Sequence, residues 1–386
     1  MMNAQIEIQI ILSLVAIACA IPGVFLVLRK MSLISDAISH SILPGIVVGF
    51  FITQDLASPL LILMATLTGV VTVVLVEYIQ KTGLVKEDTA IGLVFPSLFS
   101  IGVILISRNA GDVHLDVDAV LLGEVAFAPF DRWMWNETDM GPKSLWMMGT
   151  VLLLILTLLL LFYKELKVAT FDAGLAASMG FVPMAIHYGL MTVASITTVG
   201  AFDAIGAVLV VAFMIVPAAC IYLLTDNLKK LLIYSSVLAV VCSLVGYWFA
   251  SVWDTSIAGT IASVLGLVFF IIYLTAPGKG YFSQWYKEKQ QKTEVALLVF
   301  LLHLANHDEE QERNINHLQE HINWGAQRAK KVLKLANQNN MIAIENDIIS
   351  LTNKGLDFTK QAIAYISDNK NSELEGVKQR FFLFRG

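Results

Sequence analysis

Long apolar segments recur nine times within the first 275 residues of this 386-residue chain. Each is long enough to cross the hydrocarbon core of a bilayer, which takes roughly 20 helical residues. The mean hydropathy is +0.70 and only 15% of residues are charged, which excludes a soluble globular protein. We therefore expect an all-α polytopic membrane protein. Its predicted spans are 7–28, 34–53, 57–79, 89–107, 144–163, 183–199, 204–225, 231–250 and 256–275.

Charges in the loops predict the orientation of these spans. Lysine and arginine fall in alternate loops, which the positive-inside rule assigns to the cytoplasm, so we expect the N-terminus outside and the C-terminus inside. The first apolar run has no charged leader and no small-residue cleavage site, and we expect it to be a retained span. The opposite loops are acidic, above all 108–143. An acidic outer mouth would concentrate cations, although acids that gather where basic residues are excluded would give the same pattern.

An acid and an imidazole stand four positions apart inside the second apolar segment. Asp36 and His40 lie in MSLISDAISHSILPG, residues 31–45, and four positions make about one helical turn, so both side chains project from one face. Aspartate near the bilayer centre costs about 2.5 kcal/mol or more, and it is tolerated where it faces a polar path or partner. A carboxylate with an imidazole suits a divalent transition metal. The alternative is a buried pair that holds two helices together.

Two donors do not fill a coordination sphere, so other groups must complete the site. Water, a second copy of the chain or a further acid could do so. Asp203, in GAFDAIG, is the best further acid, although beside Gly200 and Gly206 it could equally cap a helix. Glu77 is a weaker candidate ligand. His187 is a lone imidazole in a span, a position where interhelical hydrogen bonding is the commoner role.

The sequence gives no sign of cysteine chemistry and lacks a motif for ATP binding. Cys19, Cys220 and Cys242 lie in apolar segments without a CxxC spacing, so neither a disulfide framework nor a thiolate metal site is indicated. The chain has no GxxxxGK[ST] motif, and APGKG lacks its spacing and its hydroxyl. We therefore expect a protein that is not an enzyme by itself, and that relies on another subunit for ATP hydrolysis.

Three sequence blocks carry a family resemblance. They are LRKMSLISDAISHSILPGIVVG at 28–49, VHLDVDAVLLGEVAFAPFD at 113–131 and TTVGAFDAIGAVLVVAFMIVPAACIYLLTDNL at 197–228. Together they resemble the permease subunit of manganese/zinc/iron ABC importers, over nearly all of residues 1–280. The resemblance implies that Asp36 and His40, which match the family's DAxSH element, contact the metal along the translocation path.

The same resemblance implies the cargo, the location and the partners. The cargo would be Mn(II), Zn(II) or Fe(II), carried into the cytoplasm across the bacterial inner membrane, with no permanently bound cofactor. The blocks HLDVDAVLLGE and GAFDAIGA point to the manganese/iron branch. Expected partners are an ABC ATPase, a periplasmic or extracellular solute-binding protein, membrane lipid, and a second copy or a related permease. For the solute-binding protein, the loop with Phe127, Phe130, Trp133 and Trp135 is a candidate landing surface, although these aromatics could simply mark the membrane interface.

The loop between the fifth and sixth spans is the expected contact for the ATPase. Its sequence, KELKVATFDAGLAASMGFVP, is rich in small residues at helical spacing. The AxxxG pattern from Ala176 to Gly180 resembles the family's coupling helix, although an ordinary connecting helix would read similarly. The residues expected to couple the permease to the ATPase are Phe171, Asp172, Ala176, Ala177 and Gly180.

After APGKG the chain becomes polar, and its domain structure changes. We expect a transmembrane permease domain at 1–278, a small α+β winged-helix-like cytoplasmic domain at 290–370, and a tail at 371–386. Helices are expected at 293–305, 314–322 and 324–340, then a hairpin around Glu345 and a final helix. This order resembles the DNA-binding domains of bacterial metal-responsive repressors.

A regulatory or docking role suits this domain better than nucleic-acid binding. Arg328, Lys330, Lys331 and Lys334 could contact phosphates, but residues 291–386 hold 12 basic and 12 acidic side chains, so the domain is not basic. Two pairs at helical spacing could sense metal or could be ordinary solvated faces. They are His303 with His307 and His317 with His321. For the whole chain, the alternatives to an ABC permease are a secondary metal carrier and a membrane-tethered metal-responsive regulator.

Overall fold

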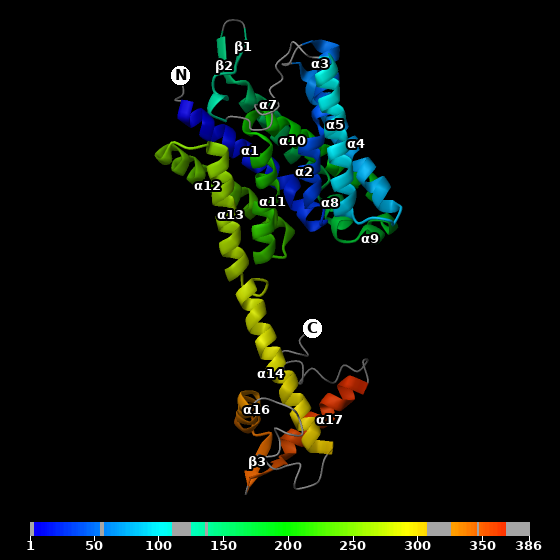
Figure 1. Ribbon diagram of the computed structural model, residues 1–386, viewed down its shortest axis with the longest axis vertical. Coiled ribbons are helices and arrows are strands. Elements are labelled where there is room, and N and C mark those ends of the chain that lie inside the picture. The colour runs from blue at the N-terminus through cyan, green and yellow to red at the C-terminus, as the bar shows by residue number, and fades with distance from the viewer. Residues whose placement is uncertain are drawn as a thin grey trace. The chain divides into compact units, whose positions relative to one another are not determined.

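The computed structural model of the chain describes residues 4–54, 58–109, 125–135, 138–306, 326–345 and 347–367. The chain divides into two compact units, Met1–Pro277 and Gly278–Gly386 (Figure 1). The first unit is a helical bundle with one small hairpin, and the second combines helices with a second hairpin.

The first unit confirms the predicted all-α polytopic fold. In the described part of the chain, nine spans are long and apolar enough to cross a membrane. Their limits differ from the expected ones by a few residues, as in Leu228–Trp253 against 231–250. The helices of this unit are α1 (Ala4–Leu28), α2 (Ser32–Ser41), α3 (Leu43–Thr53), α4 (Pro59–Lys81), α5 (Glu87–Asn109), α7 (Lys143–Leu161), α8 (Tyr163–Phe171), α9 (Ala173–Ser178), α10 (Pro183–Ile205), α11 (Ala207–Leu224), α12 (Leu228–Trp253) and α13 (Ile257–Thr275).

Polar side chains fix where several of these helices begin. The side chain of Asn227 accepts hydrogen bonds from the backbone N–H groups of Lys229 and Lys230 at the start of α12. At the start of α13, the Ser256 hydroxyl accepts one from the N–H of Gly259. Such caps satisfy amides that the first turn of a helix leaves without an intrahelical partner.

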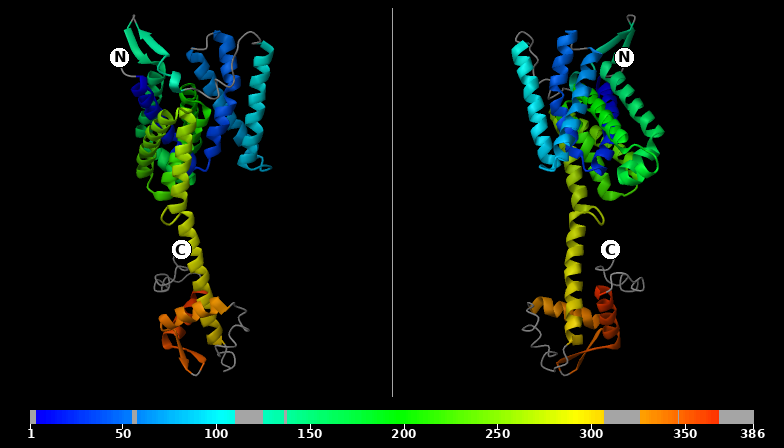
Figure 2. Two further views of the ribbon diagram at one scale, coloured as in Figure 1. Left: turned by 60° about the vertical axis from the view of Figure 1, so that its left-hand side comes forward. Right: turned by 90° about the vertical axis from the view of Figure 1, so that its right-hand side faces the viewer.

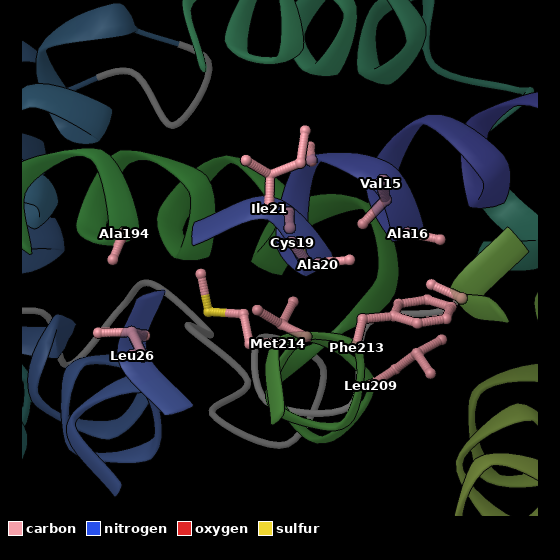
Figure 3. Packing of buried hydrophobic residues seen from close by; sticks show 14 of the residues in the cluster. Val15, Ala16, Cys19, Ala20, Ile21, Leu26, Ala194, Leu209, Phe213 and Met214 are labelled. Atoms are coloured by element: carbon pink, nitrogen blue, oxygen red, sulfur yellow. The ribbon is translucent and has the colours of Figure 1, made fainter. Parts of the chain in front are cut away.

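Helix α1 forms the centre of the first unit. It contacts α7, α10, α11 and α12, and most side chains from Ile8 to Leu26 are buried. Figure 3 shows Cys19 and other small side chains of α1 beside Met214 of α11. A Cβ atom on Gly23 would overlap the carbonyl oxygen of Met214, so only glycine allows this backbone approach. Small residues at helix crossings are the usual means of close packing within a membrane.

A short hairpin is tied to the start of α1 by charge. Strands β1 (Arg132–Trp135) and β2 (Thr138–Pro142) pair antiparallel and follow the 3₁₀ turn η1 (Val125–Phe127). Arg132 Nε lies 2.6 Å from Asp139 Oδ2, and Arg132 Nη1 lies 3.2 Å from Glu7 Oε2. Glu7 is almost fully buried, and Arg132 supplies the opposite charge that a buried carboxylate requires.

The second unit begins with a longer helix than the sequence predicted. Helix α14 (Tyr281–Asn306) is unbroken for 26 residues, whereas we expected a helix only at 293–305 (Figure 2). The added first half carries Lys287, Glu288 and Lys289, which have good helix propensity but no apolar periodicity. Extending a helix that has already formed needs no second nucleus, so this polar half continues the apolar one.

The rest of the second unit packs on α14. Helices α16 (Ala326–Gln338) and α17 (Asn353–Ser367) follow, with the expected hairpin of β3 (Ile342–Glu345) and β4 (Ile348–Leu351) between them. Asp347 adopts φ 62° in the two-residue turn, as such hairpins require. The expected helix at 314–322 and the tail at 371–386 lie outside the described residues, and the winged-helix assignment stays a prediction. The buried core comprises Ala296, Leu297, Phe300, Leu301, Leu304, Val332, Ala336, Met341, Ile342, Ile349 and Phe358.

Candidate metal site

Asp36 and His40 project from one stripe of α2, as their spacing predicted. His40 Nε2 lies 3.5 Å from Asp36 Oδ1. This distance is longer than a good hydrogen bond, so the carboxylate and the imidazole both keep lone pairs that could bind a cation. The Asp36 and His40 side chains are 43% and 37% exposed, and the His40 ring centroid lies 5.8 Å from that of Phe95 on α5. The pair therefore faces outward from the chain and is not buried in its core.

The opposite face of α2 is held in place by hydroxyl groups. Ser35 donates a hydrogen bond to Met214 Sδ on α11 at 2.8 Å, and Ser41 Oγ lies 2.6 Å from Thr72 Oγ1 on α4. Both serines are fully buried. The stripe that carries Asp36 and His40 thus has a fixed support on its opposite side.

The span that carries the pair is broken directly after it. Helix α2 ends at Ser41 and α3 begins at Leu43, with Pro44 in its first turn. Proline has no N–H to continue a helix but fits the first turn of the next one. Gly45 follows, and a Cβ there would overlap the Met64 carbonyl oxygen of α4. We did not predict this break, although Pro44 and Gly45 were its visible signals.

The described residues do not bring a third donor to Asp36 and His40. Among them, no group of three or more histidine, cysteine, aspartate or glutamate side chains could hold a metal ion. Asp203 lies inside the last turn of α10, and Gly206 occupies the N-cap position of α11. Asp203 therefore does not occupy the N-cap position of α11. The placement of its side chain lies outside what the structure describes, so its role as a ligand stays a prediction.

Glu77 and His187 pair with each other. The His187 imidazole on α10 contacts the Glu77 carboxylate on α4. Tyr188 donates a 2.8 Å hydrogen bond to Glu77 Oε2, and Lys81 Nζ lies 3.4 Å from the same oxygen. Glu77 already has these partners, which argues against it as a metal ligand. The interhelical role considered for His187 is the one observed. The sequence could not reveal this pair because its two members lie on helices far apart in the chain.

The expected coupling segment is a short helix with one buried residue. Helix α9 begins after Asp172, whose Oδ1 accepts a hydrogen bond from Leu175 N, and ends before Gly180, which has φ 87°. Ala176 is fully buried, because this position of α9 packs on its own unit, so Ala176 is not available to a partner. Phe171 and Ala177 are exposed.

The segment formed by α8 and α9 also carries exposed apolar side chains, two of which we did not predict as contacts. Phe171, Leu175 and Met179 are each more than half exposed. They stand four residues apart in the sequence, but Phe171 ends α8, Leu175 lies in α9 and Met179 follows α9, with Asp172 extended between the two helices. The signal for Leu175 and Met179 was present in the sequence as this i, i+4, i+8 spacing.

Comparison with known proteins decides the family. The model of the ABC 3 transport family matches residues 2–276. The chain belongs to the ABC 3 transport family. Its match ends where the first compact unit ends, so this ABC 3 family chain carries the Gly278–Gly386 unit in addition.

Two relatives of this chain are named for the transport of a metal. It is 45% identical over 354 residues to the zinc transport system membrane protein TroD of Treponema pallidum, which covers 91% of this chain and 96% of TroD. It is 43% identical over 267 residues to the manganese transport system membrane protein MntD of Bacillus subtilis, covering 69% of this chain and 90% of MntD. The first match is long enough to extend into the second unit.

A solved structure supports the fold of the family. The chain matches PsaBC from Streptococcus pneumoniae in complex with Fab, with a TM-score of 0.59 and 29% identity. The match covers 73% of this chain and 94% of that chain.

The histidines considered as metal sensors fall mainly outside the described residues. His303 lies in α14 and is partly buried. His307, His317 and His321 lie outside the described ranges, so the sensing hypothesis stays a prediction.

Proposed function

We propose that this chain is the membrane-spanning permease subunit of an ABC importer that carries a divalent transition metal across the bacterial inner membrane. The observation that carries the proposal is the half-exposed pair of Asp36 and His40 on α2, within the ABC 3 family match. One anionic oxygen and one imidazole give a metal moderate affinity, which suits a site that must release its ion. Family membership supplies the transport class.

The site is completed by groups from outside α2. Because both donors face outward, a second permease subunit set against this face could bring its own pair to the same ion. A homodimer would supply four protein donors, and a related permease would supply a similar set. Water and Asp203 are the other candidates. Four donors of this kind would satisfy the coordination of zinc and leave manganese or iron to add water.

Manganese is the proposed cargo, with iron or zinc as alternatives. Relatives are named for zinc and for manganese. Stability constants follow the Irving–Williams order and favour zinc at equilibrium, so selection has to come from geometry and availability. The three cysteines, Cys19, Cys220 and Cys242, are buried within the bundle. Buried cysteines in apolar surroundings are inert, so they do not offer the thiolates that zinc prefers.

ATP hydrolysis is assigned to a partner that docks on α8 and α9. The exposed side chains of Phe171, Leu175 and Met179 support this, because exposed apolar groups in a connecting segment mark a contact surface. Under the predicted positive-inside orientation, α8 and α9 face the cytoplasm. The solute-binding protein is assigned to the outer side, where Phe127 and Phe130 are mostly exposed.

The decisive test is ATP-dependent uptake. Vesicles that contain the permease with its ATPase, with the solute-binding protein supplied on the outer side, should accumulate Mn²⁺ only with ATP inside the compartment that corresponds to the cytoplasm. Vesicles that contain the permease alone should not. Uptake by the permease alone under a proton gradient would instead establish a secondary carrier.

A further inference from the structure

A chain of polar contacts joins four segments at the end of the bundle that carries α8. Arg29, directly after α1, donates through Nε and Nη2 to Thr170 Oγ1 of α8, at 3.4 Å each. Its Nη1 lies 3.2 Å from His187 Nδ1 of α10. On the other side of the ring, His187 Nε2 contacts Glu77 of α4. One uninterrupted path therefore runs from α8 to α10 and α4.

We propose that Arg29, His187 and Glu77 are positioning residues that transmit movement of the ATPase-docking segment to the helices supporting the metal pair. This inference rests on the proposed function, since it assigns α8 and α9 to the ATPase. The three residues do not touch the metal. They connect the segment that would move with ATP to the helices that would open the path.

The cluster is unsuited to hold a metal ion itself. Arg29 and Lys81 both carry a positive charge. Arg29 contacts the His187 imidazole, and Lys81 lies close to the Glu77 carboxylate. A third cation would be repelled there, and Glu77 already accepts from Tyr188 and contacts Lys81 and His187. The cluster is thus chemically distinct from the Asp36 and His40 pair.

Simple stabilisation also explains the cluster poorly. The Glu77 and His187 side chains are only 13% and 18% exposed. Replacing a buried ion pair by apolar groups of similar volume is often neutral or stabilising, so such pairs are weak evidence for stability. Directional contacts between helices have another use, because they break or move together when one helix shifts.

The far end of the path is packed tightly against the metal-bearing helix. Thr72 of α4 contacts Ser41, and Glu77 lies five residues further along α4, about 7.5 Å toward the α8 end. A Cβ on Gly69 of α4 would come 2.8 Å from Ser195 Oγ of α10 and 3.1 Å from Ile38 Cγ2 of α2. Helices α2, α4 and α10 are therefore closely packed at Gly69, and a shift of α4 and α10 would press on α2 there.

The weakest contact of the path is the one between Arg29 and α8. The two hydrogen bonds from Arg29 to Thr170 are long at 3.4 Å, whereas Tyr188 and Glu77 are joined at 2.8 Å. Movement of α8 should therefore strain the Arg29 to Thr170 contact first. Substitution of Thr170 therefore tests the path with the least disturbance of the other contacts.

The experiment compares metal uptake with ATP hydrolysis in the same vesicles, which hold the permease assembled with its ATPase and are supplied with the solute-binding protein. The variants are Thr170→Val, which keeps the shape and removes the hydroxyl, and Glu77→Gln, which removes the charge. Thr157→Val is the matched control, because Thr157 is exposed on α7 and its hydroxyl bonds to Leu153 O of its own helix. Mn²⁺ affinity of each purified permease is measured alongside.

Both variants should hydrolyse ATP at close to the wild-type rate but import about threefold to thirtyfold fewer ions per ATP. Mn²⁺ affinity and the control should be unchanged. An unchanged ratio of ions to ATP in Thr170→Val overturns the proposal even if Glu77→Gln fails to assemble. A fall in Mn²⁺ affinity with Glu77→Gln overturns it in favour of a ligand role. If wild type itself shows no ATP-dependent uptake, the proposed function fails instead.

Discussion

Ser41 Oγ and Thr72 Oγ1 lie 2.6 Å apart, one residue beyond His40, and join α2, the helix of the proposed metal pair, to α4. Both hydroxyls are buried within the span. Each is also within hydrogen-bonding distance of a carbonyl of its own helix, Ile38 O and Thr68 O. A hydroxyl has one proton, so one of the two donates across the contact while the other keeps the bond to its own helix. The contact is therefore a single hydrogen bond that joins α2 to α4.

Replacing Thr72 by valine should weaken metal binding more than it weakens the fold. Interhelical hydrogen bonds in membranes average about 0.6 kcal/mol, so unfolding should change only slightly. Loss of the contact frees α2 to tilt, and Mn²⁺ affinity should fall several-fold. Isothermal titration and thermal melting of the detergent-solubilised protein measure the two effects. Thr150→Val on exposed α7 is the control. An unchanged affinity for Thr72→Val would show that α2 needs no such support.

Gly23→Ala should destabilise the first unit. The added Cβ overlaps the Met214 carbonyl oxygen, so α1 and α11 must separate. Overpacking of this kind costs about 1–3 kcal/mol. Gly266→Ala in α13 is the matched control, because a Cβ atom at Gly266 would meet nothing within 4 Å. Thermal melting of the two variants measures the difference, and equal melting temperatures would contradict the close approach of α1 and α11.

The hairpin attachment should be sensitive to acid. The hydrogen bond from Arg132, followed by that from the Gly141 N–H, lowers the pKa of Asp139. A carboxyl whose pKa is lower in the folded state stabilises the fold at pH values above its unfolded pKa, about 3.9, and this contribution is lost as pH falls through the folded value. Wild type should therefore be more stable than Asp139→Asn at neutral pH, and this stability gap, the difference in the free energy of unfolding, should disappear below about pH 4.

Thermal melting across pH measures that gap. Asp131→Asn is the control, since Asp131 forms an exposed pair with Lys143. A gap between wild type and Asp139→Asn that persists unchanged at pH values well below about 3.9 would rule out the ion pair as its origin.

The sequence predicted the spans well and the contacts between them poorly. Apolar length alone located all nine candidate spans in the described part of the chain, because the bilayer sets their length. The i, i+4 spacing likewise placed Asp36 beside His40. Glu77 and His187 meet only through the packing of α4 against α10, which no local pattern encodes. The polar first half of α14 was missed because helix propensity without periodicity gives no core-facing stripe.

Leu175→Asp should abolish metal-stimulated ATP hydrolysis by the assembled transporter. The substitution places a charge at an exposed apolar position of α9 while leaving the buried Ala176 contact intact. Membrane insertion should be normal. Ala177→Trp should act in the same way through bulk. Val295→Asp, at another exposed apolar site, on α14, is the control. Hydrolysis that survives Leu175→Asp would place the ATPase elsewhere.

The most direct test of the account is Mn²⁺ uptake by vesicles holding the assembled transporter with Asp36→Ala or His40→Ala. The control is Glu288→Ala, because Glu288 and Lys292 form another i, i+4 pair, one exposed on α14 and outside the spans. Each α2 substitution should reduce uptake to background, while the control should transport like wild type. Normal uptake of Mn²⁺, Fe²⁺ and Zn²⁺ by both α2 variants would contradict this prediction.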